Sequence, residues 1–241
     1  MARVAVIVPA RDEAAAVAGT VAAALAIEGV TRVLVVDDGS RDGTAELARG
    51  AGAQVLTVAR SAGKGAALEA GLAMLDAEGL REPERLDAVL FLDADLGATA
   101  GQAAALLAPV LADEADMSVA AFPPAPAGTG GFGLAKGLAR RGVRALGSKS
   151  YAADAPLSGQ RALGPAALSA VRPIASGYGV EVALTIRALR RGLRVVEVPT
   201  TMTHPHSGRD AAGFAHRGRQ FLDVALTLTR LAFEPREGPK S

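Results

Sequence analysis

The first half of the chain alternates between short apolar runs and longer segments with apolar residues at helical spacing. The apolar runs predict buried strands at residues 4–8, 32–36, 54–58 and 87–92. The segments between them predict helices at residues 13–27, 42–49 and 64–75. Strands that alternate with helices indicate parallel βαβ units and an α/β layer fold.

The pattern changes after Ala121. Residues 122–133 are rich in proline and glycine, which predicts a long irregular loop that helps to shape a binding site, or else a linker between half-domains. Beyond it we expect helices at 134–146, 178–190 and 213–233, a strand at 193–198 and a polar loop at 204–210. We expect one domain over residues 1–241.

The composition excludes several classes of protein. The chain has 241 residues, 50% hydrophobic and 21% charged, which excludes overall disorder. It has no cysteine, which excludes disulfide scaffolds, thiolate zinc sites and a cysteine nucleophile. A net charge of +1 argues against a nucleic-acid partner. The apolar run at 4–8 is too short for a signal sequence, so we expect a cytoplasmic protein, with peripheral contact at the inner face of a membrane left open.

Polar residues follow three of the expected strands. They lie at residues 9–13, 37–40 and 93–95. In open parallel sheets, ligands bind outside the carboxyl ends of the strands, so we expect these clusters to converge on one edge of the sheet.

Asp93 and Asp95 directly follow a buried run. Alternate side chains of an extended segment share a face, so both carboxylates can point the same way. Two adjacent carboxylates need a counter-charge, and Mg²⁺ or Mn²⁺ prefers such oxygen ligands. The pair therefore favours a metal–diphosphate site over a solvated turn.

Other motifs are incomplete. The loop from Asp38 has Arg49 where a calcium loop needs glutamate, and no glycine-rich dinucleotide fingerprint follows the first strand. Residues 61–65 match only half of a phosphate loop. Lys64 at an expected helix N-terminus still suits an anion, although a simple helix start explains it equally well.

The ordered motifs together resemble the family 2 glycosyltransferases with the GT-A fold. The resemblance rests on Val-Pro-Ala-Arg-Asp-Glu at 8–13, Val-Asp-Asp-Gly-Ser at 36–40, Gly-Lys-Gly at 63–65 and Leu-Asp-Ala-Asp at 92–95, and it runs from about Val4 to Asp210. It implies a Rossmann-like, mostly parallel central sheet flanked by helices. Segments 157–162 and 197–199 are similar to those of dolichyl- and polyprenyl-phosphate sugar synthases.

The resemblance also implies roles by position. Residues 1–97 would form a nucleotide-sugar-binding half and residues 98–241 an acceptor half. The nucleotide sugar would contact Pro9, Ala10, Asp12, Glu13, Asp38, Lys64, Asp93 and Ala94. The metal, Mg²⁺ or Mn²⁺, would be held by Asp93 and Asp95, with His204 or His206 as a further ligand unless these histidines belong to a polar surface loop. The catalytic candidates are Asp95, Arg161, and Asp154 or Glu181 as general base.

The chain departs from the family pattern in four places. Asp12 stands where asparagine is frequent, and Arg11 replaces a common tyrosine or phenylalanine. Residues 96–99 and 204–209 replace the His-Pro-Pro-type run and the arginine-rich loop of the lipid-phosphate enzymes. These last two differences concern the acceptor more than the donor.

The expected function is metal-dependent transfer of a sugar from a UDP- or GDP-linked donor. An acceptor that carries a phosphate, either a polyprenyl phosphate or a small phosphorylated molecule, fits the arginines that follow the donor half. These arginines are Arg140, Arg141, Arg144, Arg161, Arg209, Arg217 and Arg219. The final helix, with His216 among its basic residues, suits an anionic membrane surface, and a homodimer stays open.

Two other functions are considered. Nucleotidyltransferases have a glycine-rich loop with arginine and lysine after the first strand, where this chain has residues 9–13. A non-catalytic nucleotide-sugar-binding protein would not need the Asp93 and Asp95 pair.

Overall fold

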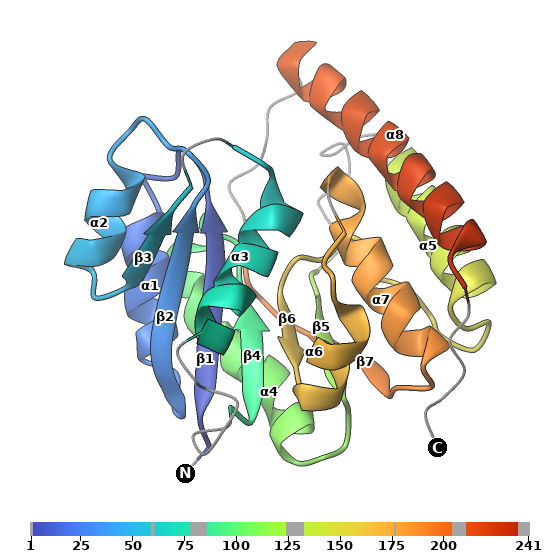
Figure 1. Ribbon diagram of the computed structural model, residues 1–241, viewed down its shortest axis with the longest axis horizontal. Helices are drawn as coiled ribbons and strands as arrows, with labels where there is room; N and C mark the ends of the chain where they lie inside the picture. The colour runs from blue at the N-terminus through green and yellow to red at the C-terminus, as the bar shows by residue number, and fades with distance from the viewer. Residues whose placement is uncertain are drawn as a thin grey trace.

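The computed structural model describes residues 2–58, 61–77, 86–123, 133–175, 177–203 and 211–235, with only the main chain for residues 178 and 211–220. Within these ranges the strands form one seven-stranded sheet in the order β3-β2-β1-β4-β6-β5-β7 (Figure 1). The strands are β1 Val4–Ala10, β2 Val30–Asp37, β3 Gln54–Thr57, β4 Ala88–Phe91, β5 Met117–Ala121, β6 Arg161–Leu163 and β7 Val195–Pro199. Both expected halves contribute to this sheet.

The sheet is mostly parallel, as predicted. β2 and β4 pair in parallel with β1 on its two sides, and β3 pairs in parallel with β2. β6 is antiparallel to both of its neighbours, β4 and β5, whereas β5 and β7 are parallel. The short reversed strand therefore joins the two parts of the sheet.

Helices cover both faces of the sheet (Figure 1). They are α1 Val17–Leu25, α2 Thr44–Gly50, α3 Lys64–Ala77, α4 Ala104–Leu111, α5 Leu134–Leu146, α6 Pro165–Val171, α7 Val180–Arg190 and α8 Ala211–Phe233, with 3-10 turns η1 Gly97–Ala103 and η2 Gly177–Gly179. Residues of α1, η1 and α4 share one buried cluster, and residues of α3, α6 and α7 share another. A third cluster joins α5 and α8 to the outside of α7.

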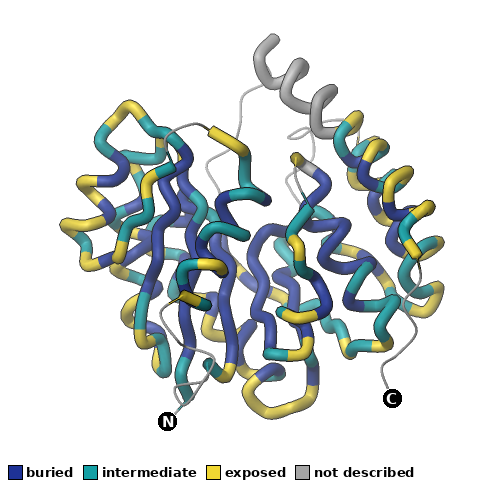
Figure 2. Tube along the Cα trace, viewed as in Figure 1, coloured by how far each residue is buried: buried dark blue, intermediate teal, exposed yellow. Residues whose placement is uncertain are grey.

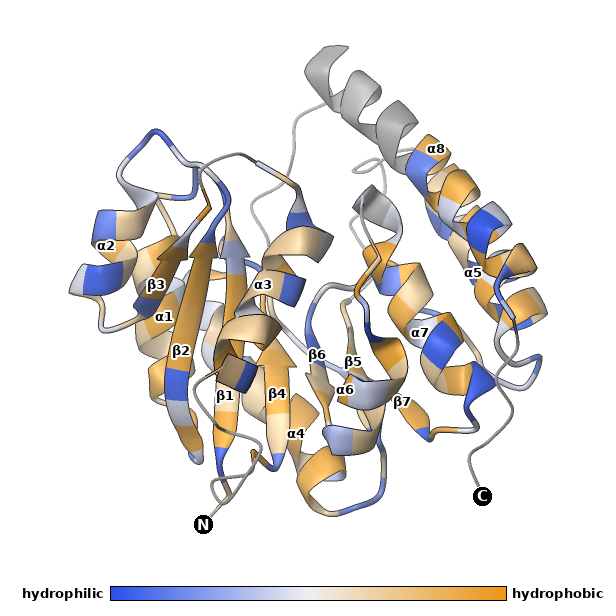
Figure 3. Ribbon diagram, viewed as in Figure 1, coloured by the Kyte–Doolittle hydropathy of each residue, from blue (hydrophilic) through white to orange (hydrophobic). Residues whose placement is uncertain are grey.

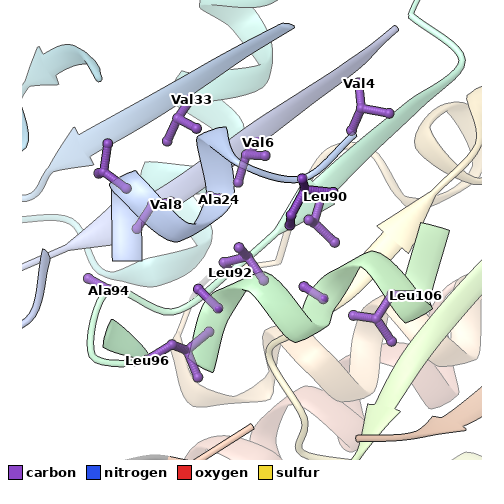
Figure 4. Close-up of a cluster of buried hydrophobic side chains, with 14 of the residues drawn as sticks. Val4, Val6, Val8, Ala24, Val33, Leu90, Leu92, Ala94, Leu96 and Leu106 are labelled. Carbon is purple, nitrogen blue, oxygen red and sulfur yellow. The ribbon is translucent and has the colours of Figure 1, made fainter. Parts of the chain in front are cut away.

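The central strands are buried on both faces. In β1, Val4, Val6 and Val8 belong to the cluster with α1 and α4, whereas Ala5 and Ile7 belong to the cluster with α3 (Figure 4). This two-sided burial explains why the strands are continuous apolar runs and not alternating ones. Figures 2 and 3 show the same strands as buried and hydrophobic.

Two boundaries differ from the sequence prediction for local reasons. β1 continues through Pro9 to Ala10. Proline is accepted there because β4 ends at Phe91 opposite Ile7, so Pro9 pairs only with β2. α1 begins at Val17 and not at residue 13, because the amides of Glu13 and Ala14 donate to Thr44 and Asp42 across the neighbouring loop.

Five elements lie where no element was predicted: η1, α4, β5, β6 and α6. Most of the expected loop at 122–133 and all of the polar loop at 204–210 lie outside the described residues. Over the part of the chain that the structure describes, no helix has the length and hydropathy needed to cross a membrane.

The close packing of α8 on η2, the turn directly before α7, generates a stability prediction. A Cβ atom added to Gly179 would lie 2.4 Å from the Cβ of Thr227 on α8, whereas one added to Gly137 on α5 would meet nothing within 4 Å. We expect Gly179→Ala to lower the free energy of unfolding by about 1–3 kcal/mol through overpacking. Gly137→Ala should raise it by about 0.5–1 kcal/mol through the lost flexibility of the unfolded chain. Urea unfolding of both variants measures this; equal effects would contradict the packing.

Candidate active site

The three polar clusters converge on one edge of the sheet, as predicted. They border a pocket of about 280 Å³ at the carboxyl ends of β1, β2 and β4. Its lining consists of Pro9, Ala10, Arg11, Asp38, Ser61, Gly63, Lys64, Ala67, Asp93 and Gly177. This cavity thus combines two carboxylates with a lysine and an arginine. We call it the donor pocket, after the role that the resemblance implies for residues 1–97.

Asp12 connects the first two clusters. Its φ of 54° is in the left-handed region, which aspartate tolerates better than most residues. Its amide donates to Ser40 Oγ at 2.9 Å, and its Oδ1 accepts the amide of Arg41 at 2.8 Å. Asp12 therefore fixes the loop after β1 to the loop after β2.

Asp38 holds the segment that leads into α3. Its carboxylate accepts hydrogen bonds from Ser61 Oγ at 2.7 Å and from the amides of Ala62 at 2.8 Å and Gly63 at 2.9 Å. The residue is 5% exposed, so these bonds satisfy a buried charge. They also fix the segment immediately before Lys64.

Asp93 is the centre of the site. Its Oδ1 lies 2.6 Å from Lys64 Nζ, and its Oδ2 accepts a hydrogen bond from Gln160 Nε2 at 2.6 Å. Lys64 Nζ also lies 2.9 Å from Glu181 Oε1. Burial by itself lowers the pKa of Lys64, but the Asp93 and Glu181 carboxylates outweigh it and raise the pKa, so the lysine stays charged.

Gly159 leaves room for this network. A Cβ atom at this position would lie 2.3 Å from Lys64 Nζ and within 2.9 Å of both Asp93 oxygens. Only glycine therefore allows the main chain before β6 to approach the ion pair so closely.

The acidic residues beside Asp93 form a negative region. The pKa of Glu13 is raised, first by burial and then by the charges of Asp95 and Asp93. Across the described residues, no group of three or more histidine, cysteine, aspartate or glutamate side chains gathers in a complete metal cage. The donor set of one or two carboxylates fits Mg²⁺ or Mn²⁺, which completes its shell with water and substrate phosphates.

A second pocket lies on the other side of Asp93. It has a volume of about 550 Å³, and its lining consists of Asp93, Ala121, Phe122, Pro123, Lys136, Asp154, Ala155, Pro156, Leu157, Ser158, Gly159 and Gln160. We call it the acceptor pocket, after the role that the resemblance implies for residues 98–241. Asp93 lines both pockets, which places its carboxylate where they meet.

Glu197 from β7 supports the wall of the acceptor pocket. It accepts hydrogen bonds from the Tyr151 hydroxyl at 3.0 Å and from the amides of Asp154 and Ala155, both at 3.1 Å. Burial, followed by the charge of Glu197, raises the pKa of Tyr151, so its hydroxyl stays a donor. Asp154 itself forms an ion pair with Arg140 at 2.9 Å.

The comparisons with known proteins now identify the family. The model of the family described as glycosyl transferase family 2 matches residues 5–161. The chain belongs to glycosyl transferase family 2. Glycosyltransferase AglJ of Haloferax volcanii is 30% identical over 191 residues, which are 76% of this chain and 57% of that relative. This chain thus spans less than two thirds of the length of AglJ.

Solved structures agree with the family. Glucosyl-3-phosphoglycerate synthase from Mycobacterium tuberculosis, in complex with Mn²⁺, UDP-glucose and phosphoglyceric acid, gives a TM-score of 0.78 at 26% identity, covering 97% of this chain and 81% of that one. The same synthase with Mg²⁺ and UDP gives a TM-score of 0.78 at 25% identity, covering 97% and 80%. The expected GT-A fold is confirmed.

Some of the residues expected at the site line the two pockets, and others do not. Pro9, Ala10, Asp38 and Lys64 line the donor pocket, and Asp154 lines the acceptor pocket. Neither pocket is lined by Asp12, Glu13, Ala94, Asp95 or Glu181. Ala94 contributes its carbonyl, which accepts a hydrogen bond from Thr20 Oγ1 at 2.8 Å and so fixes the turn that carries Asp95.

Arg161 has a different place from the one expected of a catalytic residue. It is completely buried and lines neither pocket. Its Nε donates to the Ser158 carbonyl at 2.9 Å and its Nη1 to Thr185 Oγ1 at 2.7 Å, so it ties the wall of the acceptor pocket to α7. Burial lowers its pKa, opposed by the charges of Glu181, Tyr151 and Glu197. In this structure Arg161 is enclosed by protein, and its contact with an acceptor stays a prediction.

Other expected site residues belong to the part of the chain that the structure does not describe. His204, His206 and Arg209 lie outside the described residues, as do the side chains of residues 211–220, which include Arg217 and Arg219. Sequence reasoning missed Gln160 as a partner of Asp93 and Glu197 as the support of the 151–155 segment. Gln160 could have been proposed as a site residue because it lies beside Arg161 in the 157–162 segment, which resembles the family.

Proposed function

We propose that the protein transfers a sugar from a nucleoside-diphosphate sugar to a phosphate-bearing acceptor, with Mg²⁺ or Mn²⁺ as cofactor. One observation carries this proposal: the donor and acceptor pockets meet at Asp93. A group bound in one pocket can therefore react with a group bound in the other without leaving the protein. Residues 1–97 supply most of the donor side, and later residues supply most of the acceptor side.

The donor pocket has the chemistry that a nucleotide needs. Pro9, Ala10 and Asp38 lie where the strands end, and Lys64 and Arg11 bring positive charge to the same cavity. Lys64 begins α3, so the free amides of a helix start add to its attraction for a diphosphate. We assign the nucleotide to this pocket, in agreement with the UDP bound by the phosphoglycerate synthase.

The two aspartates have separate roles in this proposal. Both oxygens of Asp93 accept bonds from the protein, one from Lys64 and one from Gln160, so Asp93 has a fixed orientation toward the donor. Asp95 is the residue we assign to the metal. When bound there, a divalent ion supplies Lewis-acid stabilisation of the negative charge on the diphosphate leaving group.

The positive charge at the acceptor pocket favours a phosphorylated substrate. Lys136 lines this pocket, and Arg140 lies within ion-pair distance of its wall residue Asp154. A phosphate nucleophile is already ionised and needs no strong base. A hydroxyl nucleophile needs one, and Asp154 is placed for that role because it lines the pocket, whereas Glu181 is bound to Lys64.

Two kinds of acceptor carry a phosphate group that this pocket could bind. The related synthase binds phosphoglyceric acid, a small phosphorylated molecule. A polyprenyl phosphate presents the same phosphate on a lipid. An assay with UDP- and GDP-sugars, offered in parallel with phosphoglycerate and a short polyprenyl phosphate, separates the two kinds. Donor binding without acceptor-dependent turnover on either one would contradict the proposed transfer and favour a nucleotide-sugar-binding protein.

Replacement of Asp95 tests the metal role. We expect Asp95→Asn to reduce turnover at least a hundredfold while the free energy of unfolding changes by less than about 1 kcal/mol, because the residue is only half-buried at a strand end. Initial rates with and without EDTA, beside urea unfolding, measure both effects. Turnover that survives both the substitution and EDTA would exclude the metal role.

Replacement of Gln160 tests the orientation of Asp93. We expect Gln160→Leu to lower kcat/KM for the donor by roughly tenfold or more, since a charge-assisted hydrogen bond to Asp93 is lost. Ser158→Ala is the matched control, because it removes only the 3.3 Å bond to Gln160 Oε1 and keeps the contact with Asp93. Equal losses in the two variants would contradict this role for Gln160.

A further inference from the structure

The described part of α8 exposes a row of large apolar side chains. Leu222, Leu226 and Phe233 are 61%, 56% and 86% exposed. Their spacing of four and seven residues places them along one side of the helix. Val224 and Leu231, on the opposite side, are buried in the cluster with α5 and α7. Figure 2 shows the exposed positions repeating along α8, and Figure 3 shows hydrophobic positions along it.

The neighbouring helix α5 is strongly basic. It carries Lys136, Arg140, Arg141 and Arg144 and no acidic residue, whereas the whole chain has a net charge of only +1. The rest of the chain is therefore net acidic, and the positive charge is concentrated on one outer helix. All four of these residues are exposed.

The two helices lie side by side and form one outer layer (Figure 1). A Cβ atom on Gly142 of α5 would touch Leu228 of α8. Further along both helices, Arg190 donates to the carbonyls of Leu146 at the end of α5 and Leu231 near the end of α8. The two helices therefore run in the same direction. Leu134, at the start of α5, is 67% exposed. Apolar and basic side chains are thus combined on one face of the molecule, called the α5–α8 face below.

We propose that the α5–α8 face binds the surface of an anionic lipid bilayer. Exposed leucine and phenylalanine enter the headgroup boundary, and the arginines and lysine attract negative headgroups, which is how an amphipathic helix lies on a membrane without crossing it. A second copy of the chain fits the face less well. A symmetric dimer would set the basic helix α5 close to its own copy, and such like charges repel.

This inference goes beyond the proposed transfer reaction. It concerns where the protein resides and holds for a soluble acceptor as well as for a lipid-linked one. The face is also next to the acceptor pocket, because Lys136 lines that pocket and Arg140 pairs with Asp154. A bilayer on this face would therefore lie beside the acceptor side of the site.

Co-sedimentation of the full chain with vesicles tests the proposal. We expect binding to vesicles that contain phosphatidylglycerol, little binding to pure phosphatidylcholine, and release as the salt concentration rises. Arg141→Gln/Arg144→Gln should weaken binding by an order of magnitude or more, since each basic residue near an anionic surface contributes about fivefold. Leu222→Gln/Leu226→Gln should weaken it similarly.

Matched controls keep the test specific. Leu47→Gln/Leu111→Gln changes two leucines that are 44% and 39% exposed on α2 and α4. Arg32→Gln/Arg49→Gln changes a half-buried arginine on β2 and an exposed one on α2. These variants should bind like the unmodified protein, and circular dichroism checks that all variants are folded. Equal binding by control and α5–α8 variants, or no binding to anionic vesicles, would overturn the proposal. A dimer that the Leu222→Gln/Leu226→Gln variant makes monomeric, seen by light scattering, would assign the face to a second copy.

Discussion

The ion pair between Lys64 and Asp93 is the contact on which the arrangement of the site depends. Lys64 begins α3, Asp93 follows β4, and Glu181 in the first turn of α7 shares the same ammonium group. Two carboxylates in a partly buried place repel unless a cation lies between them. The lysine therefore fastens the first half of the chain to the second. Gln160 completes the network by holding the other oxygen of Asp93.

This network explains how the pockets keep their relation to one another. The glycine at position 159 lets the main chain before β6 lie against the ion pair, and the buried Arg161 fixes the same segment to α7. The wall of the acceptor pocket thus includes Gln160, which also holds an oxygen of Asp93. Direct contacts therefore connect the residues on the two sides of Asp93.

The sequence was sufficient for the first half of the fold and for the place of the site. Long apolar runs and helical periodicity predicted β1 to β4 and α1 to α3, and the convergence of polar clusters at the sheet edge follows from parallel connections alone. The reversed strand β6 has only three residues and begins with arginine, so it carries no periodic signal. Its pairing with β4 and β5 depends on tertiary contacts that local patterns do not encode.

The sequence pattern predicted which residues lie near the edge of the sheet, but it did not predict which contacts each of them makes. Lys64 and Asp38 line the same pocket, and the carboxylate of Asp38 also holds the 61–63 segment through three hydrogen bonds. Arg161 was expected at the acceptor because arginine binds phosphate, but burial gives it a supporting role. The sequence of a three-residue strand does not show which of its side chains are buried, so the burial of Arg161 could not be predicted.

The most direct test of the account is a crystal structure of the protein with Mn²⁺ and UDP, with data collected at the manganese edge. The account predicts an anomalous peak next to Asp95 and nucleotide density in the donor pocket, between Pro9, Asp38 and Lys64. It also predicts that Lys64 and Gln160 keep their contacts with Asp93. Manganese and nucleotide bound away from this edge of the sheet, or an Asp93 carboxylate released from both partners, would contradict it.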